Sequence, residues 1–231
     1  MIQKFLLLLF LYLLATPSNA AIVVYTGRSN FNGVTGNQII DDYENAKYQH
    51  VMTDAYTSSV LGETTYFTYG GNINNYNNII PGYGVGGGHS YCSLCYGSFV
   101  LSFGNATVTE NGGVFAVGLD ITYNTDNEMN PTNKHSANVT LVDGTTQLFQ
   151  LPRVLDPSEY EFWGITSNIG IASVDFMAYS STLPDRTFLH IDNLTIASPV
   201  PVPAGIWLFG VGLISLIGVG SRKRVSGPVV N

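Results

Sequence analysis

The chain has 231 residues, of which 45% are hydrophobic and only 11% are charged. All 16 acidic residues lie between Asp41 and Asp192, whereas four of the nine basic residues lie in the two terminal segments. The middle of the chain therefore carries five basic against 16 acidic residues, a net charge of −11. Such a body is repelled by polyanions, which excludes nucleic acid as a partner. Its polarity comes from Asn, Thr, Ser, Gly and Tyr, which is typical of a β-rich extracellular module.

The first twenty residues have the order of a secretory signal. Lys4 precedes an apolar run from Phe5 to Ala15, and Ser18 and Ala20 supply small residues before a cleavage point. The apolar run is too short for a stable membrane span. The sequence therefore predicts a signal helix within residues 1–20, cleavage after Ala20, and export through the inner membrane.

The body, residues 21–197, alternates short apolar or β-branched runs with turn residues. Gly104-Asn105 and Asp143-Gly144 are typical of hairpin turns, and no segment shows a capped helical period. About ten short strands at this spacing predict one all-β domain, a β-sandwich of jelly-roll-like form. The expected strands cover 22–25, 38–43, 64–69, 98–103, 106–109, 114–123, 137–141, 145–151, 162–166, 169–179 and 188–196. On the strand 114–123, Phe115, Val117, Leu119 and Ile121 mark the expected core face.

Residues 70–97 differ in composition, because Gly, Asn and Tyr fill 17 of these 28 positions. Such a stretch predicts a long, irregular surface loop. It contains the only two cysteines, Cys92 and Cys95. Export to an oxidising compartment favours a short-range disulfide between them. A zinc site that includes His89, or a free redox-active pair, remains an alternative.

The C-terminal segment has three parts. A proline-rich linker, residues 198–203, is followed by residues 204–220, which carry no charge and just reach the length of a bilayer span. A basic cluster then holds the residues 221–231 on the cytoplasmic side. The cluster consists of Arg222, Lys223 and Arg224. The pattern predicts a transmembrane helix over 204–220 and an inner-membrane-anchored precursor.

This arrangement resembles the PEP-CTERM sorting signal of Gram-negative bacteria, in its Val-Pro-x-Pro-Ala variant, over residues 198–226. The motif residues are Val200, Pro201, Val202, Pro203 and Ala204. The chain departs from the pattern in lacking the Glu of the core and in its longer tail. The resemblance implies cleavage near the proline motif by exosortase, a membrane protease, and retention at the cell surface or in the extracellular matrix. Many proteins with this tail belong to bacteria that make exopolysaccharide and form biofilm.

The closing strands of the body also resemble those of jelly-roll domains that precede such tails and of carbohydrate-binding modules. The segments are 162–167, 171–176 and 188–195. In such modules a calcium ion often ties early and late strands together, so the resemblance implies calcium as a cofactor. The implied ligands are Glu44 and Asp192, with Asp42 and Asp120 as further candidates. The alternative is that these four are ordinary exposed carboxylates at strand ends.

Aromatic residues indicate a second kind of site. Aromatic rings offer apolar faces with polar tips, which suits stacking on sugars. The candidates are Tyr76, Tyr83, Tyr91, Tyr96 and Trp163. The alternative is that Tyr is simply common in exposed β structure and in glycine-rich loops.

Motifs of catalysis are missing from the sequence, since none of the four histidines lies in a HExxH pattern and there is no GxSxG. We therefore expect a non-catalytic, structural or interaction protein of the cell surface or matrix, linked to exopolysaccharide or biofilm. One alternative is a calcium-stabilised carbohydrate-binding module whose partner is a polysaccharide. A further alternative is a polysaccharide hydrolase on the same scaffold.

Overall fold

The computed structural model describes residues 21–44, 55–62, 64–69, 77–93, 98–109, 112–124, 134–154, 159–179 and 188–200. The chain divides into two units, Met1–Pro199 and Val200–Asn231, and the fold below is that of the first. The predicted signal helix and the predicted transmembrane helix with its basic tail lie outside the described residues. Within these ranges, no helix combines the length and the apolar character that a membrane crossing requires.

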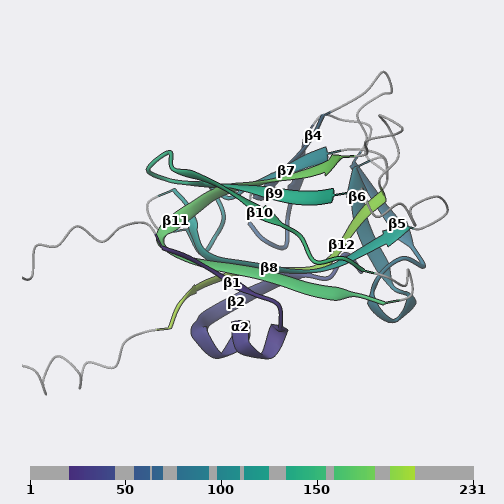
Figure 1. Cartoon of the computed structure of the whole chain (residues 1–231), viewed down its shortest axis with the longest axis horizontal. Coiled ribbons are helices and arrows are strands. Elements are labelled where there is room, and N and C mark those ends of the chain that lie inside the picture. The colour runs from purple at the N-terminus through teal and green to yellow at the C-terminus, as the bar shows by residue number, and fades with distance from the viewer. Residues whose placement is uncertain are drawn as a thin grey trace, which may run out of the picture. The chain divides into compact units, whose positions relative to one another are not determined.

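Two layers of antiparallel strands face each other (Figure 1). The first layer contains β1 (Ile22–Tyr25), the first half of β11 (Glu161–Tyr179), β8 (Val114–Asn124), β12 (Phe188–Pro199), β2 (Thr35–Asp41), β6 (His89–Ser93) and β5 (Asn77–Pro81). The second contains β10 (Thr146–Gln150), β9 (Lys134–Leu141), the second half of β11, β7 (Ser98–Ser102), β4 (Thr64–Tyr69) and β3 (Ala55–Ser58). The predicted all-β sandwich is confirmed, and its jelly-roll form stays a prediction.

Strand β11 belongs to both layers. Its residues 161–166 pair with β8, and residues 164–167 pair with β1 on the other side. Past this point, residues 171–179 pair with β9 and residues 173–176 with β7. The sequence predicted two strands here, 162–166 and 169–179, but the backbone continues as one strand that bends from one layer into the other.

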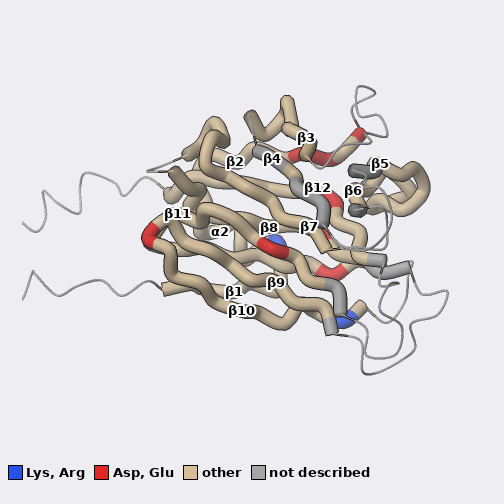
Figure 2. The backbone as a smooth tube through the Cα atoms, turned by 90° about the horizontal axis from the view of Figure 1, so that it is seen from above, with Lys and Arg blue, Asp and Glu red and all other residues tan. Residues whose placement is uncertain are grey.

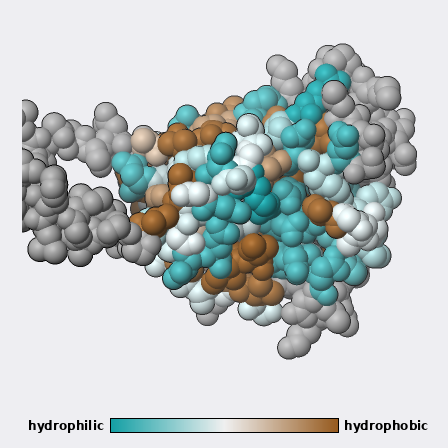
Figure 3. Space-filling view, turned by 90° about the horizontal axis from the view of Figure 1, so that it is seen from below, coloured by the Kyte–Doolittle hydropathy of each residue, from teal (hydrophilic) through white to brown (hydrophobic). Residues whose placement is uncertain are grey.

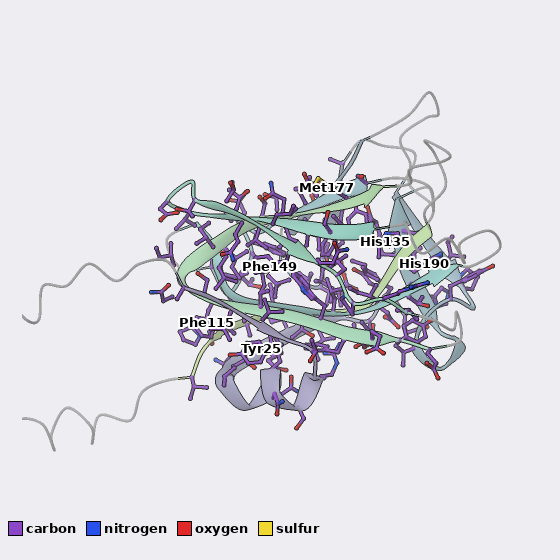
Figure 4. The ribbon with its side chains drawn as sticks, viewed as in Figure 1. Tyr25, Phe115, His135, Phe149, Met177 and His190 are labelled. Atoms are coloured by element: carbon purple, nitrogen blue, oxygen red, sulfur yellow. The ribbon has the colours of Figure 1, made fainter. Side chains whose placement is uncertain are left out.

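The core lies between the layers and follows the period-two alternation of the strands. Val117, Leu119 and Ile121 are fully buried in it, as their spacing predicted. Phe149 of β10 packs against the same core and lies between the layers in Figure 4. Phe115 is the exception, because it joins a second cluster on the outer face of the first layer instead.

One residue of that second cluster comes from a helix, α2 (Arg28–Val34), which the sequence did not predict. The helix has seven residues, no side-chain cap and no acidic residue in its first turn, so it carries few of the features by which a helix start is recognised. Its Phe31 is fully buried against the outer face. Figures 1 and 4 show α2 beneath the first layer, with Tyr25 and Phe115 beside it.

Two glycines make room for Phe31. Gly118 of β8 and Gly164 of β11 are cross-strand partners. A Cβ atom at Gly118 would lie 2.9 Å from the Phe31 ring, and one at Gly164 would lie 2.8 Å from it. The ring therefore sits on bare backbone, which accounts for both glycines in otherwise apolar strands.

One strand expectation and one loop expectation were wrong. Residues 106–109 form turns rather than a strand. Residues 70–97 are not an irregular loop throughout, because they contain β5, the short helix η1 (Val85–Gly87) and β6. Tyr91 of β6 is fully buried and packs on Phe99, with ring centroids 5.0 Å apart. The composition of this stretch did not predict these strands, because cross-strand pairing and one buried aromatic residue can order a glycine-rich segment.

A buried carboxylate links the two layers at one edge. Asp41, at the end of β2, is fully buried. Its Oδ2 accepts hydrogen bonds from the Ser58 hydroxyl of β3 at 2.7 Å and from the Tyr66 hydroxyl of β4 at 3.4 Å. Its Oδ1 accepts the Tyr43 N–H at 3.2 Å. These donors offset the cost of removing a carboxylate from water.

We predict that Gly118→Ala and Gly164→Ala each lower the free energy of unfolding by about 1–3 kcal/mol, because the added methyl group collides with the rings of Phe31 and Phe162. Urea unfolding measures this. Gly33→Ala is the matched control: it lies in α2, a Cβ there meets nothing within 4 Å, and a helical alanine should be neutral or stabilising. Equal stability of Gly118→Ala and Gly33→Ala would contradict the packing account.

Candidate functional site

Polar side chains gather on the outer face of the first layer. Leu189 and Ile191 of β12 point into the core, so His190 and Asp192 point to the outer face. Asp192 is the cross-strand partner of Asp120 on β8, and Asp120 is in turn the partner of Phe162 on β11. Figure 3 shows this outer face as largely hydrophilic, with separate hydrophobic patches.

A β-bulge in β12 lies next to the pair of Asp192 and Asp120. Asp192 pairs with Asp120 and Thr195 pairs with Gly118, so β12 has one residue more than β8 between these pairs. Asn193 absorbs it with a φ of 48°, in the left-handed region that Asn tolerates better than most residues. The bulge directs the Asn193 side-chain amide to Asp120, with Nδ2 2.9 Å from Oδ2.

Arg28, the first residue of α2, supplies a positive charge. Its guanidinium lies 2.9 Å from Asp120 Oδ2 and 4.7 Å from the centre of the Phe162 ring. It also donates to the Thr195 hydroxyl at 3.1 Å. Arg28 therefore compensates the charge of Asp120, while no ion pair with Asp192 is present among the described residues.

The segment between β5 and β6 lies over the same face. Its Val85 N–H donates to Asp192 Oδ2 at 2.7 Å, and the Asn193 N–H donates to Oδ1 at 2.6 Å. At the start of β6, the His89 N–H donates to the Glu44 carboxylate, and His89 Nδ1 lies 2.7 Å from Glu44 Oε2. Asp192 thus holds the middle of the segment, at Val85, and Glu44 holds its C-terminal end, at His89.

This segment presents Tyr83 to solvent. The ring stacks on His190, with centroids 5.0 Å apart and planes 17° apart. His190 is 1% exposed and its Nδ1 lies 3.0 Å from the Ser90 hydroxyl, whereas Tyr83 remains 42% exposed. The Tyr160 hydroxyl also donates to the Tyr83 carbonyl oxygen. One face of the Tyr83 ring is thereby covered by His190, and the residue as a whole stays exposed. Figure 4 shows His190 where β12 runs beside β6.

The electrostatics of the face are dominated by carboxylates. Burial, with Asp120 and Glu44 nearby, raises the pKa of Asp192 to about 6, although its two backbone hydrogen bonds act in the opposite direction. Burial, with Asp192 and Asp120 nearby, raises the pKa of Tyr160 to about 12, so its hydroxyl stays protonated as a donor. Hydrogen bonds from His89 lower the pKa of Glu44. Figure 2 shows red segments near the β6 and β12 labels.

The four predicted calcium ligands lie in this region, and each of them has at least one hydrogen-bond or ion-pair partner there. Asp120 is held by Arg28, and Glu44 by His89. Asp42 Oδ1 accepts the Glu44 N–H at 3.2 Å, and Asp192 is bonded on both oxygens. No three His, Cys, Asp or Glu side chains in the described ranges are grouped as a metal site. Calcium binding by these residues stays an untested prediction.

The five predicted sugar-stacking residues are not one platform. Tyr91 and Trp163 are 0% and 1% exposed and belong to the core, so including them was wrong. Large aromatic rings gain more by filling the core between two layers than by standing in water. Tyr76 and Tyr96 lie outside the described residues. Tyr83 is thus the one candidate that the structure places at an exposed position.

The predicted cysteine pair is described at one end only. Cys92 is fully buried in β6, whereas Cys95 lies outside the described residues, so the disulfide stays a prediction. The zinc alternative also stays untested, and the one further ligand named for it, His89, has its Nδ1 2.7 Å from Glu44 Oε2.

Several residues of this face were missed from the sequence. Arg28 and His190 lie in no recognisable motif, and Tyr160 lies outside any predicted strand. The bulge residue, Asn193, is of a type that is enriched at positive φ, and this was the one indication of the bulge in the sequence. Enrichment of this kind does not by itself locate a bulge.

Comparisons with known proteins add little. No family model matches the sequence, and no curated protein does. Among solved structures, the chain is similar to a family 29 carbohydrate-binding module complexed with cellulohexaose, with a TM-score of 0.30 and 12% identity. The match covers 79% of this chain and 94% of that one. A likeness of this size carries no argument, so the function has to be inferred from the geometry of the face.

We predict that Asp192→Asn becomes more stable relative to the wild type as the pH rises. Because the pKa of Asp192 is raised to about 6, the folded state holds its proton more tightly than the unfolded chain does. Its contribution to stability is full in acid, below the unfolded value of about 4, and is lost as the pH rises through 6. Urea unfolding of both proteins between pH 4.5 and 7.5 measures this.

Asp143→Asn is the control for a general change of charge, since Asp143 is exposed at a turn and accepts only the Thr145 N–H in the described structure. A wild-type to Asp192→Asn difference that does not vary with pH, once this control is subtracted, would contradict the buried carboxylate.

Proposed function

We propose that this chain is an exported, non-catalytic protein of the bacterial surface or matrix whose β-sandwich binds polysaccharide through the outer face of its first layer. The observation that carries the proposal is the exposed Tyr83 ring, stacked at 5.0 Å on the buried His190. An exposed ring that is backed by a buried histidine is suited to stacking on the C–H face of a sugar. Fixing the ring beforehand lowers the entropy lost on binding.

Polar groups of the kind that sugar hydroxyls need lie in the same region. Glu44 is 46% exposed at its side chain, and the Asp120 carboxylate is 14% exposed. Arg28 and Asn193 hold Asp120 in place. A few fixed polar groups beside an aromatic surface are the usual composition of a small-molecule site. The geometry therefore favours the carbohydrate-binding alternative over a purely structural role.

The hydrolase alternative is less favoured by the geometry. Asp192 has a raised pKa next to a second carboxylate, which is a feature of glycosidase acids. However, Asp192 is only 3% exposed, and both of its oxygens accept backbone N–H groups. A general acid has to reach the glycosidic oxygen within hydrogen-bond distance. Asp192 instead holds the Tyr83 segment in place.

The terminal segments supply the location in this proposal. The resemblance of residues 198–226 to the PEP-CTERM signal supports exosortase as a processing partner and retention at the surface after cleavage. The sandwich ends just before the motif, because Pro199 is the last residue of β12 and pairs with Thr35 of β2. Processing at the motif would thus leave the described sandwich intact.

We predict that Tyr83→Ala weakens binding to a soluble polysaccharide by about threefold to tenfold, the value of one aromatic stacking contact. Tyr83→Phe keeps the ring and should bind nearly as the wild type does. Affinity electrophoresis against a panel of glucans, mannans and chitin derivatives measures this. Leu148→Ala, at a 62% exposed position of β10 in the other layer, is the control. Binding that is unaffected by Tyr83→Ala would refute this face as the site.

We predict that replacing Pro201 and Pro203 by Ala causes the uncut precursor to accumulate in the membrane of an exosortase-bearing host. Immunoblotting of membrane and surface fractions measures this. Pro199→Ala, within β12 and before the motif, is the matched control and should be processed normally. Normal processing in a strain without exosortase would count against the sorting proposal.

A further inference from the structure

The charged groups around the Tyr83 ring are mostly negative. Val85, two residues beyond Tyr83, is bonded to Asp192, and the Tyr83 carbonyl oxygen accepts from Tyr160, which Asp192 and Asp120 both influence. Glu44 accepts the N–H of His89, directly after the segment, and is close enough to Asp192 to raise its pKa. The Tyr83 face thus combines one open aromatic ring with three carboxylates.

The positive groups of the described residues do not balance these charges. Arg28 lies 2.9 Å from Asp120 and is committed to it. His89 contacts Glu44 through Nδ1, and it balances that charge only when its ring is protonated. No cation contacts Asp192 in the described ranges. An uncompensated carboxylate beside a partly dry surface attracts cations and repels anions more strongly than one in open water.

The ring and the buried histidine beneath it distinguish this face from a mere acidic patch. His190 is 1% exposed, and its Nε2 has no hydrogen-bond partner among the described residues. Burial lowers the pKa of His190 to about 4, so the ring is neutral at ordinary pH and adds no positive charge under Tyr83. A sugar stacked on Tyr83 would therefore meet a neutral aromatic surface bordered by negative groups.

We propose that the glycan bound at Tyr83 carries free amino groups, a class that includes de-N-acetylated amino-sugar polymers, rather than being neutral or uronic-acid-based. This rests on the polysaccharide-binding function proposed above. An ammonium group beside the stacked sugar would approach Glu44, whose carboxylate is 46% exposed, and Asp42, which is exposed next to it. Carboxylate groups on a uronic acid would instead face the negative charges of Glu44 and Asp192.

The test compares hexasaccharides that share one β-1,4 backbone and differ only at carbon 2. Cellohexaose has a hydroxyl there, N-acetylchitohexaose has an acetamide, and chitosan hexaose has an amine. Isothermal titration at pH 6 and low salt should give a chitosan hexaose affinity at least about tenfold above that of cellohexaose, and oligogalacturonate should not bind. Glu44→Gln should reduce the chitosan advantage by about threefold or more, and added salt should reduce it further. Tyr83→Ala should lower the affinity for all three hexasaccharides by a similar factor.

The control for general attraction to an acidic protein is Asp143→Asn. It removes one exposed charge from the turn between β9 and β10, which belong to the second layer. It should leave the chitosan advantage unchanged. Equal affinities for the three hexasaccharides, or an advantage that Asp143→Asn reduces as much as Glu44→Gln does, would overturn the amino-sugar assignment and leave polysaccharide binding intact. No binding of any hexasaccharide or polymer would overturn the proposed function itself.

Discussion

The fold depends on the single strand β11, which pairs with β8 and β1 in one layer and with β9 and β7 in the other. Its 19 residues fix the register of four neighbours at once. A slip of one residue would turn every core side chain outward on both layers, because side chains alternate along a strand. The strand therefore also places Phe162 opposite Asp120 of β8, and β8 in turn pairs Asp120 with Asp192 of β12.

The helix and the polar face are parts of one arrangement. Gly118 and Gly164 leave a hollow on the outer face, and Phe31 fills it. This contact holds α2 in position, and α2 begins with Arg28, whose guanidinium lies on Asp120. The packing of one aromatic ring on two glycines thus determines where the positive charge of the face is placed.

Two buried carboxylates have different parts in the structure. Asp41 is surrounded by hydroxyl donors and joins the edge of one layer to the other. Asp192 accepts backbone N–H groups and holds the segment that presents Tyr83. The tyrosines divide in the same way, since Tyr91 fills the core while Tyr83 stands at the surface. Residue type alone does not tell which Asp or Tyr has which of these roles, because the role depends on the neighbours that the fold places around the side chain.

The sequence by itself determined the class of fold and most of the strands. Period-two alternation such as that of Val117, Leu119 and Ile121 is a local property, and so are the turns at Gly and Asn. Only the tertiary structure decided that residues 161–179 form one strand, that the Gly-rich stretch contains β5 and β6, and that α2 exists, because cross-strand pairing and the seating of Phe31 stabilise these elements. The candidate site was predicted in part, through Tyr83, Glu44, Asp120 and Asp192. The other residues around it, Arg28, His190 and Tyr160, come from distant parts of the chain, and only the packing of strands and helix brings them together.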